Sequence, residues 1–324
     1  PESLPDGPFF RLALLAHRTA RRPHGLGNLP PDGTVGPLKN CPQLFVLLHA
    51  SGYRPPDCRR RLRLRFLLRP QTQSAVHMGH GRTLIPLDGI AAAMGAEPDR
   101  VFFTSGGTEA DNWAVMGTVK RMGKRGKHII TTAMEHHAIL NCMQELEAQG
   151  YEVTYLKPNA LGQITAEELK AALRKDTILV SVMMVNNEVG SVMPIAQMAK
   201  LTHKLCPDAI FHTDAVQGFL KVPFSAKTLG ADFITLSGHK IGAPKGIGAL
   251  YIGPRVRNPR PLLPGGGQEM GLRSGTESTA QIAGFAKAVE LRWDHLEDKL
   301  HHMAEVKAYA VEKLTPIPDL QIIG

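Results

Sequence analysis

Short apolar runs alternate with helix-like stretches between residues 101 and 252, and this alternation restricts the fold more than any other feature of the chain. The seven runs have three to nine residues each and are rich in β-branched side chains; they cover 101–103, 128–132, 152–156, 177–185, 209–213, 232–236 and 247–252. Strands that alternate with helices predict crossover connections and a mainly parallel sheet. Because most of these runs are apolar throughout, we expect an α/β fold in which helices flank both faces of a seven-stranded sheet.

The composition favours a globular protein without membrane contact. The chain has 324 residues, 43% of them hydrophobic, which is enough for one large domain or two ordinary ones. Its apolar runs all fall short of the roughly 18 residues that a membrane-spanning helix needs. We therefore expect no membrane partner.

The first 73 residues differ from the rest in charge and in proline content. Residues 1–73 carry twelve Arg or Lys against four Asp or Glu and eleven of the 24 prolines, whereas residues 74–324 carry 26 basic against 25 acidic residues. The basic run 58–70 shows no helical stripe. We expect this segment to be disordered, or to be an artefact of translation in a shifted reading frame. A basic strand, a targeting peptide and a nucleic-acid-binding arm are the alternatives. The rest of the chain has no basic excess, so we expect no nucleic-acid partner.

The strand–helix alternation predicts the domain organisation. Residues 74–275 are expected to form the main domain, and residues 276–324 a helical connection and the start of a second, smaller domain. The helical pattern covers 277–314, and the apolar residues 316–324 predict the start of a strand. Because that strand has no partner before the chain ends, we expect the small domain to be incomplete.

The four cysteines argue against a structural metal site. Cys41, Cys58, Cys142 and Cys206 form no C-x-x-C pair, so neither zinc nor an iron–sulfur cluster is expected. So few cysteines in a chain of this length favour a reducing compartment, and hence a cytoplasmic location.

Polar residues follow the predicted strands, at the rim formed by the carboxyl ends of the strands, where open parallel sheets bind ligands. Gly106 and Gly107 follow the first strand, and Thr108 then opens a helix whose N–H groups favour an anion such as a phosphate monoester. His136 or His137 follows the second strand. Each feature has a plain alternative, because such turns often only cap a helix.

Polar residues also follow three further predicted strands, of which the 177–185 and 209–213 runs come first. The 177–185 run is followed by Asn186, Asn187 and Glu188, which are costly to bury unless they meet a ligand or each other. The 209–213 run is followed by Asp214, which either caps a helix or keeps a pyridinium nitrogen protonated.

Gln217 follows Asp214 in the same turn. After the 232–236 run come Ser237 and His239, which can donate to a phosphate, and Lys240, which can form a Schiff base. A lysine at a strand end is usually a solvated charge. The five positions taken together, in this order, predict a site for pyridoxal phosphate (PLP).

Six segments resemble the NifS-type (group I) cysteine desulfurases, PLP enzymes of the class V aminotransferase group. The matching segments are TSGGTEADN, MEHHAIL, VNNEVGSV, HTDAVQ, LSGHKIGAPKGIGALYI and GGGQEMGLRSGTES. The resemblance runs from about residue 74 to the end of the chain. It implies a fold type I PLP-dependent transferase, with Lys240 as the Schiff-base lysine and His136 as the ring-stacking acid/base. It also implies a set of phosphate ligands: Gly107, Thr108, Ser237 and His239.

The resemblance further implies that Asn187 and Gln217 lie at the ring hydroxyl and the substrate, and that Asp214 pairs with the ring nitrogen. Thr276 would reach the phosphate of a partner subunit, which implies a homodimer. The implied reaction converts L-cysteine to L-alanine and passes the sulfur to a protein persulfide, for iron–sulfur cluster or thio-cofactor synthesis. A sulfur-acceptor or scaffold protein is then a further partner.

The family's nucleophilic cysteine and its carboxylate-binding arginine would lie beyond Gly324, so we expect the chain as it stands not to complete sulfur transfer. Cys206 precedes Lys240 and Cys142 lies in a helix, so neither matches that nucleophile. Two alternatives stay open: a selenocysteine lyase or another class V PLP enzyme, and a catalytically incompetent fragment or scaffold that retains the fold. Turnover of cysteine to alanine and sulfide distinguishes them.

Overall fold

The computed structural model describes residues 84–322. The predictions made for residues 1–73, and the beginning of the proposed main domain at 74–83, lie outside these residues. Among the helices between residues 84 and 322, none has the length and hydropathy required to cross a lipid bilayer.

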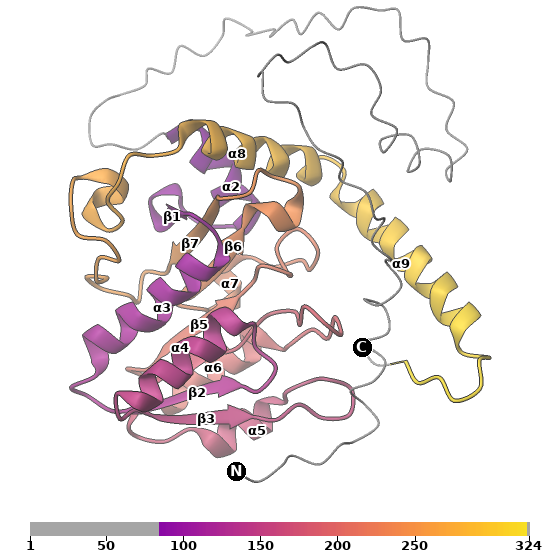
Figure 1. Ribbon diagram of the computed structural model, residues 1–324, viewed down its shortest axis with the longest axis horizontal. Helices are drawn as coiled ribbons and strands as arrows, with labels where there is room; N and C mark the ends of the chain where they lie inside the picture. Colours follow the sequence, from indigo (N-terminus) through magenta and orange to yellow (C-terminus); the bar gives the residue numbers. More distant parts are fainter. Residues whose placement is uncertain (1–83, 323–324) are drawn as a thin grey trace, which may run out of the picture. The chain divides into compact units, whose positions relative to one another are not determined.

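A seven-stranded sheet forms the centre of the described chain (Figure 1). Its strands are β1 (Val101–Thr104), β2 (His128–Thr132), β3 (Glu152–Leu156), β4 (Thr177–Ser181), β5 (Ile210–Asp214), β6 (Phe233–Ser237) and β7 (Gly248–Ile252). The spatial order is β1-β7-β6-β5-β4-β2-β3, and β7 alone runs antiparallel to its neighbours β1 and β6. The predicted mainly parallel, seven-stranded α/β sheet is therefore confirmed.

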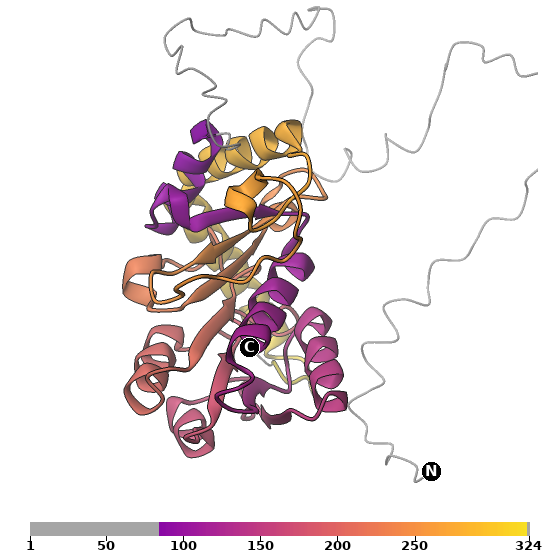
Figure 2. The same cartoon turned by 90° about the vertical axis from the view of Figure 1, so that its left-hand side faces the viewer.

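The sheet is covered on both faces, as its apolar strands require (Figure 2). One face packs against α3 (Gly107–Met122) and α4 (His137–Ala148), whose buried side chains include Trp113 and Met143. Alternate strand residues such as Ile129 and Leu179 complete this apolar cluster. Since successive side chains of a strand point to opposite faces, the intervening residues are left for the other side of the sheet.

The other face holds the larger apolar cluster, to which Ile130, Val180 and Phe211 contribute. It is covered by α5 (Ala166–Ala172), α6 (Ile195–Leu205), α7 (Ala226–Leu229), α2 (Leu84–Met94) and α8 (Thr279–Trp293). The apolar face of α8 includes the fully buried Phe285, which belongs to this same cluster. Helix α8, which follows the last strand in sequence, thus completes the core on this face of the sheet.

Three predicted elements differ from the structure. The run 177–185 is a strand only to Ser181, after which the chain turns along the rim and Val185 forms an isolated bridge with Val192. The stretch 277–314 divides at Asp294 and His295 into α8 and α9 (Leu296–Leu314). Residues 316–322 contain no strand, and no strand of the described sheet pairs with them.

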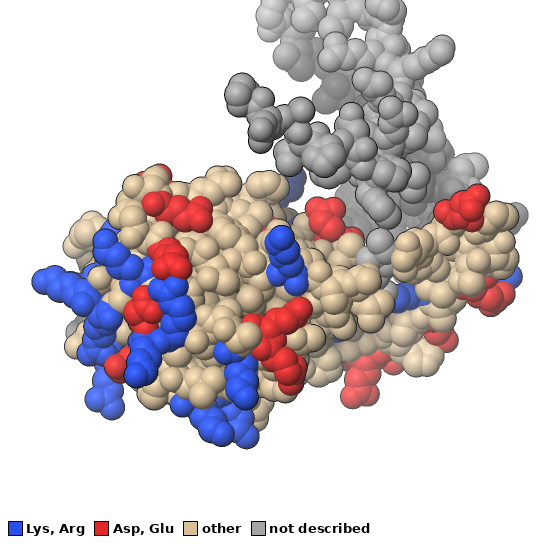
Figure 3. All heavy atoms as spheres, turned by 90° about the horizontal axis from the view of Figure 1, so that it is seen from below, with Lys and Arg blue, Asp and Glu red and all other residues tan. Residues whose placement is uncertain are grey.

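Acidic and basic side chains are intermixed on the face shown in Figure 3. Arg174 pairs with Glu152 and, at 2.7 Å, with Asp176, and Arg125 pairs with Asp208 at 3.1 Å. The charge counts of the sequence place its basic excess in residues 1–73, outside the part that the structure describes.

Candidate active site

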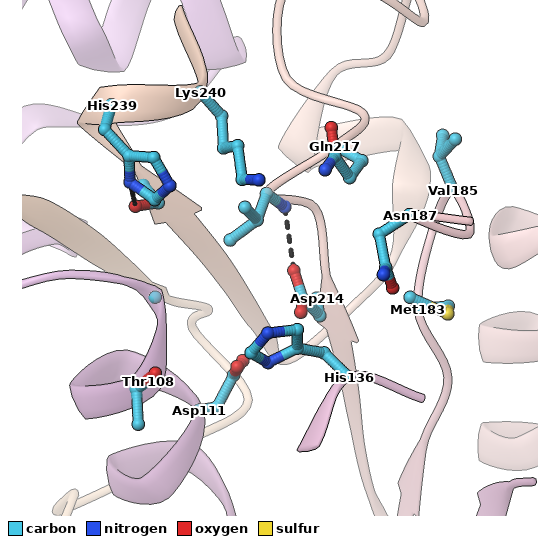
Figure 4. A pocket seen from close by; sticks show the side chains of 13 residues that line it. Thr108, Asp111, His136, Met183, Val185, Asn187, Asp214, Gln217, His239 and Lys240 are labelled. Atoms are coloured by element: carbon cyan, nitrogen blue, oxygen red, sulfur yellow. Dashed lines mark hydrogen bonds between the residues drawn. The ribbon is translucent and has the colours of Figure 1, made fainter. Parts of the chain in front are cut away.

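Nine of the ten site residues predicted from the sequence line one cavity of about 190 Å³ at the carboxyl-end rim (Figure 4). β1 runs in the same direction as the five parallel strands, because both it and β6 are antiparallel to β7. The carboxyl ends of β1, β2, β4, β5 and β6 therefore meet at this rim. The nine residues are Gly107, Thr108, His136, Asn187, Asp214, Gln217, Ser237, His239 and Lys240.

One end of the cavity is suited to an anion. α3 begins there: its first residues, Gly107 and Thr108, line the cavity, and no side chain caps the helix start at Gly106. A Cβ at Gly107 would lie 2.9 Å from Val216 Cγ2, closer than real contacts allow, so the approach of the chain requires glycine. Ser237 Oγ lies 2.8 Å from His239 Nδ1 at the same end.

Lys240 lies on the single 3-10 turn η4 (Gly238–Ile241) that follows β6 directly. Its side chain extends into the cavity from the same turn as His239 (Figure 4). Burial, together with the charge of Lys240, lowers the pKa of His239 below its usual value.

Asp214 lies at the end of β5 and is buried, with 5% of its surface exposed. Its Oδ1 accepts a hydrogen bond of 2.8 Å from the N–H of Val216. Burial raises the pKa of Asp214 to about 6, against the opposing effects of the Val216 N–H, His136 and Lys240. A cationic group placed beside this carboxylate would lower the pKa again and be bound by it.

His136 caps α4, and its orientation follows from that role. Its Nδ1 accepts a hydrogen bond of 3.1 Å from the N–H of Ala138. In the neutral ring the proton is then on Nε2. The ring lies near Asp214 in the cavity (Figure 4), and Nε2 is the ring nitrogen left for a ligand because Nδ1 is engaged. His137 does not line this cavity.

The structure also distinguishes among the three polar residues after β4. Asn186 is buried and structural: its Oδ1 accepts from the N–H groups of Glu188 and Val189, and its Nδ2 donates to Met134 O. Asn187 lines the cavity instead. The network reading therefore holds for Asn186, and a ligand contact of Asn187 stays a prediction.

Asp111 was not predicted from the sequence, although it lines the cavity. It is 1% exposed, and its Oδ1 lies 3.5 Å from His212 Nε2 and has no hydrogen-bond partner among the described residues. Burial and the charge of Asp214 raise its pKa well above the usual range. Its spacing of three residues from Thr108 on α3 was the available signal, since such residues share a helix face.

Thr276 is the one predicted residue that does not line this cavity. It lies on a second cavity, together with Arg273 and Glu277. Neither of the two cysteines within the described residues lines the first cavity, although Cys142 lines a neighbouring pocket that shares Thr108 and His136 with it. Cys142 is packed in the core, as expected, and burial raises its pKa to about 11. Burial raises the pKa of Cys206 as well.

Comparison with known families gives a match to the aminotransferase class-V model over residues 88–324. The chain belongs to the class-V aminotransferase family. Fold type I and the cofactor PLP, both expected from the sequence, are confirmed by this membership.

The curated relatives within the family include proteins named cysteine desulfurase IscS. One from Methanosarcina thermophila is 44% identical over 234 residues, which is 72% of this chain and 57% of the relative. Another, from Clostridium botulinum strain Hall, is 40% identical over 257 residues, covering 78% of this chain and 62% of the relative. The chain thus spans about three fifths of the length of these relatives.

Solved structures of the family are similar as well. A protein described as NifS-like superposes with a TM-score of 0.71 at 37% identity, covering 74% of this chain and 65% of that one. SspA, solved in complex with cysteine, superposes with a TM-score of 0.61 at 41% identity, covering 63% of this chain and 59% of that one. The recognition of a NifS-type relationship from the sequence is confirmed.

The donor groups of the cavity fit PLP. A phosphate needs N–H and hydroxyl donors, which the start of α3 and Ser237 supply at one end. The ring nitrogen needs a buried carboxylate, which Asp214 supplies. Lys240 has the amine that covalent attachment of the cofactor needs, and it lines the same cavity.

Proposed function

We propose that this chain is the PLP-binding part of a cysteine desulfurase, which converts L-cysteine to L-alanine and passes the sulfur to a protein persulfide. The observation that carries the proposal is the presence of Lys240 and Asp214 in one cavity, with an anion-binding helix start at its other end. Relatives at 40% and 44% identity bear the name cysteine desulfurase, and a related structure was solved with cysteine.

The proposed roles follow from the geometry of each residue. PLP, when bound, supplies an electron sink for the charge left on the substrate Cα after deprotonation. Lys240 would hold the cofactor covalently, and its released amine would take the Cα proton as a positioned base. Asp214 would keep the ring nitrogen protonated, and His136 would present Nε2 to the reacting atoms. Gly107, Thr108, Ser237 and His239 would bind the phosphate.

Sulfur transfer also needs a thiolate, since the thiol form is a poor nucleophile. The described cysteines do not fit this role, because both are buried and their pKa values are raised. A cysteine elsewhere in the enzyme, or a low-molecular-weight thiol in an assay, would accept the sulfur. An acceptor or scaffold protein and a cytoplasmic location stay predictions.

A homodimer is part of the proposal. Thr276 would contact the phosphate of the partner subunit, which accounts for its position outside the cavity of its own chain. Sedimentation velocity would test the dimer. A Thr276→Ala variant should weaken PLP binding about tenfold without changing the cavity of its own chain; unchanged binding by a dimeric variant would contradict the proposed role.

The absorption spectrum of the purified chain supplied with PLP tests the central claim. We expect a visible band that is absent in Lys240→Ala and retained in Lys245→Ala, the matched control for an exposed lysine in the same segment. Alanine and sulfide are then measured with cysteine as substrate and a thiol reductant as acceptor. A preference for selenocysteine would replace cysteine as the proposed substrate, and absence of the band in the unmodified chain would overturn the proposal.

A further inference from the structure

Gln217 is held in one amide orientation by a residue outside the cavity. Lys221 Nζ donates a hydrogen bond of 2.9 Å to Gln217 Oε1. Gln217 lines the cavity, whereas Lys221 does not. A carboxamide has an accepting oxygen and a donating NH2 group. Because the ammonium occupies the oxygen, Nε2 is left as the group that can donate to a ligand, and it lies on the cavity side of the oxygen in Figure 4.

The backbone between the two residues adopts a conformation that brings them together. Leu220 has φ 55°, in the left-handed region, although it is a buried leucine with 4% exposure. Such residues are uncommon outside glycine and persist where the surroundings fix them, often beside functional sites. The N–H of Lys221 then bonds to Gly218 O at 3.0 Å, so the turn returns Lys221 to Gln217.

The environment of Lys221 differs from that of a solvated surface lysine. The side chain is half-buried. Burial lowers its pKa, and the charges of Arg292 and Lys240 lower it further. Arg292 is itself fixed by a hydrogen bond of 2.9 Å from Nε to Ile241 O. A cation retained so close to two others needs an acceptor, and Gln217 Oε1 supplies it.

We propose that Lys221 is a positioning residue for the PLP site, acting through Gln217; the inference rests on the proposed function. Its ammonium selects the amide orientation that donates into the cavity, and it polarises the amide so that Nε2 is a stronger donor. The group recognised is an electron-rich oxygen of the bound cofactor. Lys221 thus affects both cofactor affinity and the electron density of the bound ring without touching either.

The experiment combines cofactor titration, absorption spectra and a double-mutant cycle. The variants are Lys221→Met, Lys221→Arg, Gln217→Leu and the double variant, with Lys200→Met as the control for an exposed lysine on α6. We expect Lys221→Met to raise the PLP dissociation constant about five- to tenfold and to shift the visible band. Lys221→Arg, which retains a donor cation, should restore both. Melting temperatures establish that each variant is folded, and Lys221→Gln replaces Lys221→Met if the latter is not.

The cycle separates positioning from general electrostatics. If Lys221 acts through Gln217, then Lys221→Met added to Gln217→Leu should change the dissociation constant less than twofold. Additive losses, or a Lys221→Met protein with the affinity and spectrum of the unmodified chain, would overturn this inference while leaving the proposed function intact. Absence of cofactor binding in the unmodified chain would overturn both.

Discussion

Buried acidic side chains surround the candidate site at the residue scale. Asp111 and Asp214 line the cavity, and Glu135 lies behind it with 4% exposure. Burial raises the pKa of all three. Three carboxylates in so little space cannot all be ionised cheaply. Asp214 is therefore expected to be the ionised one. Burial raises its pKa only to about 6, because the Val216 N–H, His136 and Lys240 all favour the carboxylate.

Cofactor binding should depend on the ionisation of Asp214. Because its pKa is raised to about 6, the carboxylate is lost as the pH falls through that value, and PLP affinity should fall with it. Asp214→Asn should bind PLP about tenfold or more weakly at pH 7.5 and lose this part of the pH dependence. PLP titrations between pH 5 and pH 8 measure this pH dependence of the affinity, with the Asp208→Asn variant of an exposed aspartate as control. An unchanged pH profile in Asp214→Asn would refute the role.

Glu135 should make the fold less stable at alkaline pH. Its pKa is about 8 when folded against an ordinary value of 4.5, so the folded chain retains a proton that the unfolded chain has lost. The free energy of unfolding contributed by that proton declines as the pH rises from about 4.5 through 8. Glu135→Gln should therefore gain about 1–3 kcal/mol relative to the unmodified chain between pH 5.5 and pH 8.5.

Urea denaturation at the two pH values measures this difference. The exposed Glu145→Gln on α4 is the matched control and should show no such gain. Equal pH dependence of the two variants would mean that Glu135 is ionised in the folded chain.

Sequence patterns predicted the residues that have a distinctive chemical type at a strand end, such as Lys240 and Asp214. They did not predict Asp111 or Lys221. The importance of these two arises from burial and from neighbours distant along the chain, including His212 for Asp111 and Arg292 for Lys221. Only the folded arrangement contains that information.

Strand β7 packs against the turn before α3 at the anion-binding end of the cavity. It lies between β6 and β1, and its first residue, Gly248, has no room for a side chain: a Cβ there would lie 2.6 Å from Leu236 O and 2.7 Å from Gly106 Cα. The run 247–252 predicted the strand, but its antiparallel position between β1 and β6 depends on long-range pairing. The early end of β4 at Ser181 was likewise missed, because the rim residues beyond it are equally apolar.

Gly248→Ala should therefore disturb β7 and the turn before α3 together. We expect a loss of about 1–3 kcal/mol in the free energy of unfolding and weaker PLP binding, because Gly106 must move. Gly117→Ala is the control: its Cβ would meet Trp113 Cδ1 at 3.4 Å, an ordinary contact, and alanine favours a helix interior. Denaturation and cofactor titration of both variants test this, and a Gly248→Ala protein as stable as the control would contradict it.

At the scale of the whole molecule, local stability should be uneven. α3 contributes eight residues to the core, whereas α9 has no buried residue. Segments with little burial open at low free energy. The sequence predicted both helices from their periodicity, but periodicity alone does not reveal what each one packs against.

Within the described residues, limited trypsin digestion should therefore cut α9 before α3. Cleavage after Lys299, Lys307 or Lys313 is expected well before cleavage after Lys120 or Arg121 at the end of α3. Mass spectrometry of the early fragments identifies the sites. Simultaneous cleavage of the two helices would show that α9 is as well protected as α3.

The pairing of β1 with β7 has a consequence for protein synthesis. Val101 pairs with Tyr251, so the first strand of the sheet acquires its neighbour only when the last strand has left the ribosome. Contacts between residues so distant in sequence form slowly. The nascent chain can assemble β2 to β6 earlier, but the turn at Gly106 and Gly107 is not fixed until β7 arrives. Cofactor capture is then expected to follow translation of the whole sheet, and the unpaired strands before that moment are the stage at which chaperones matter most.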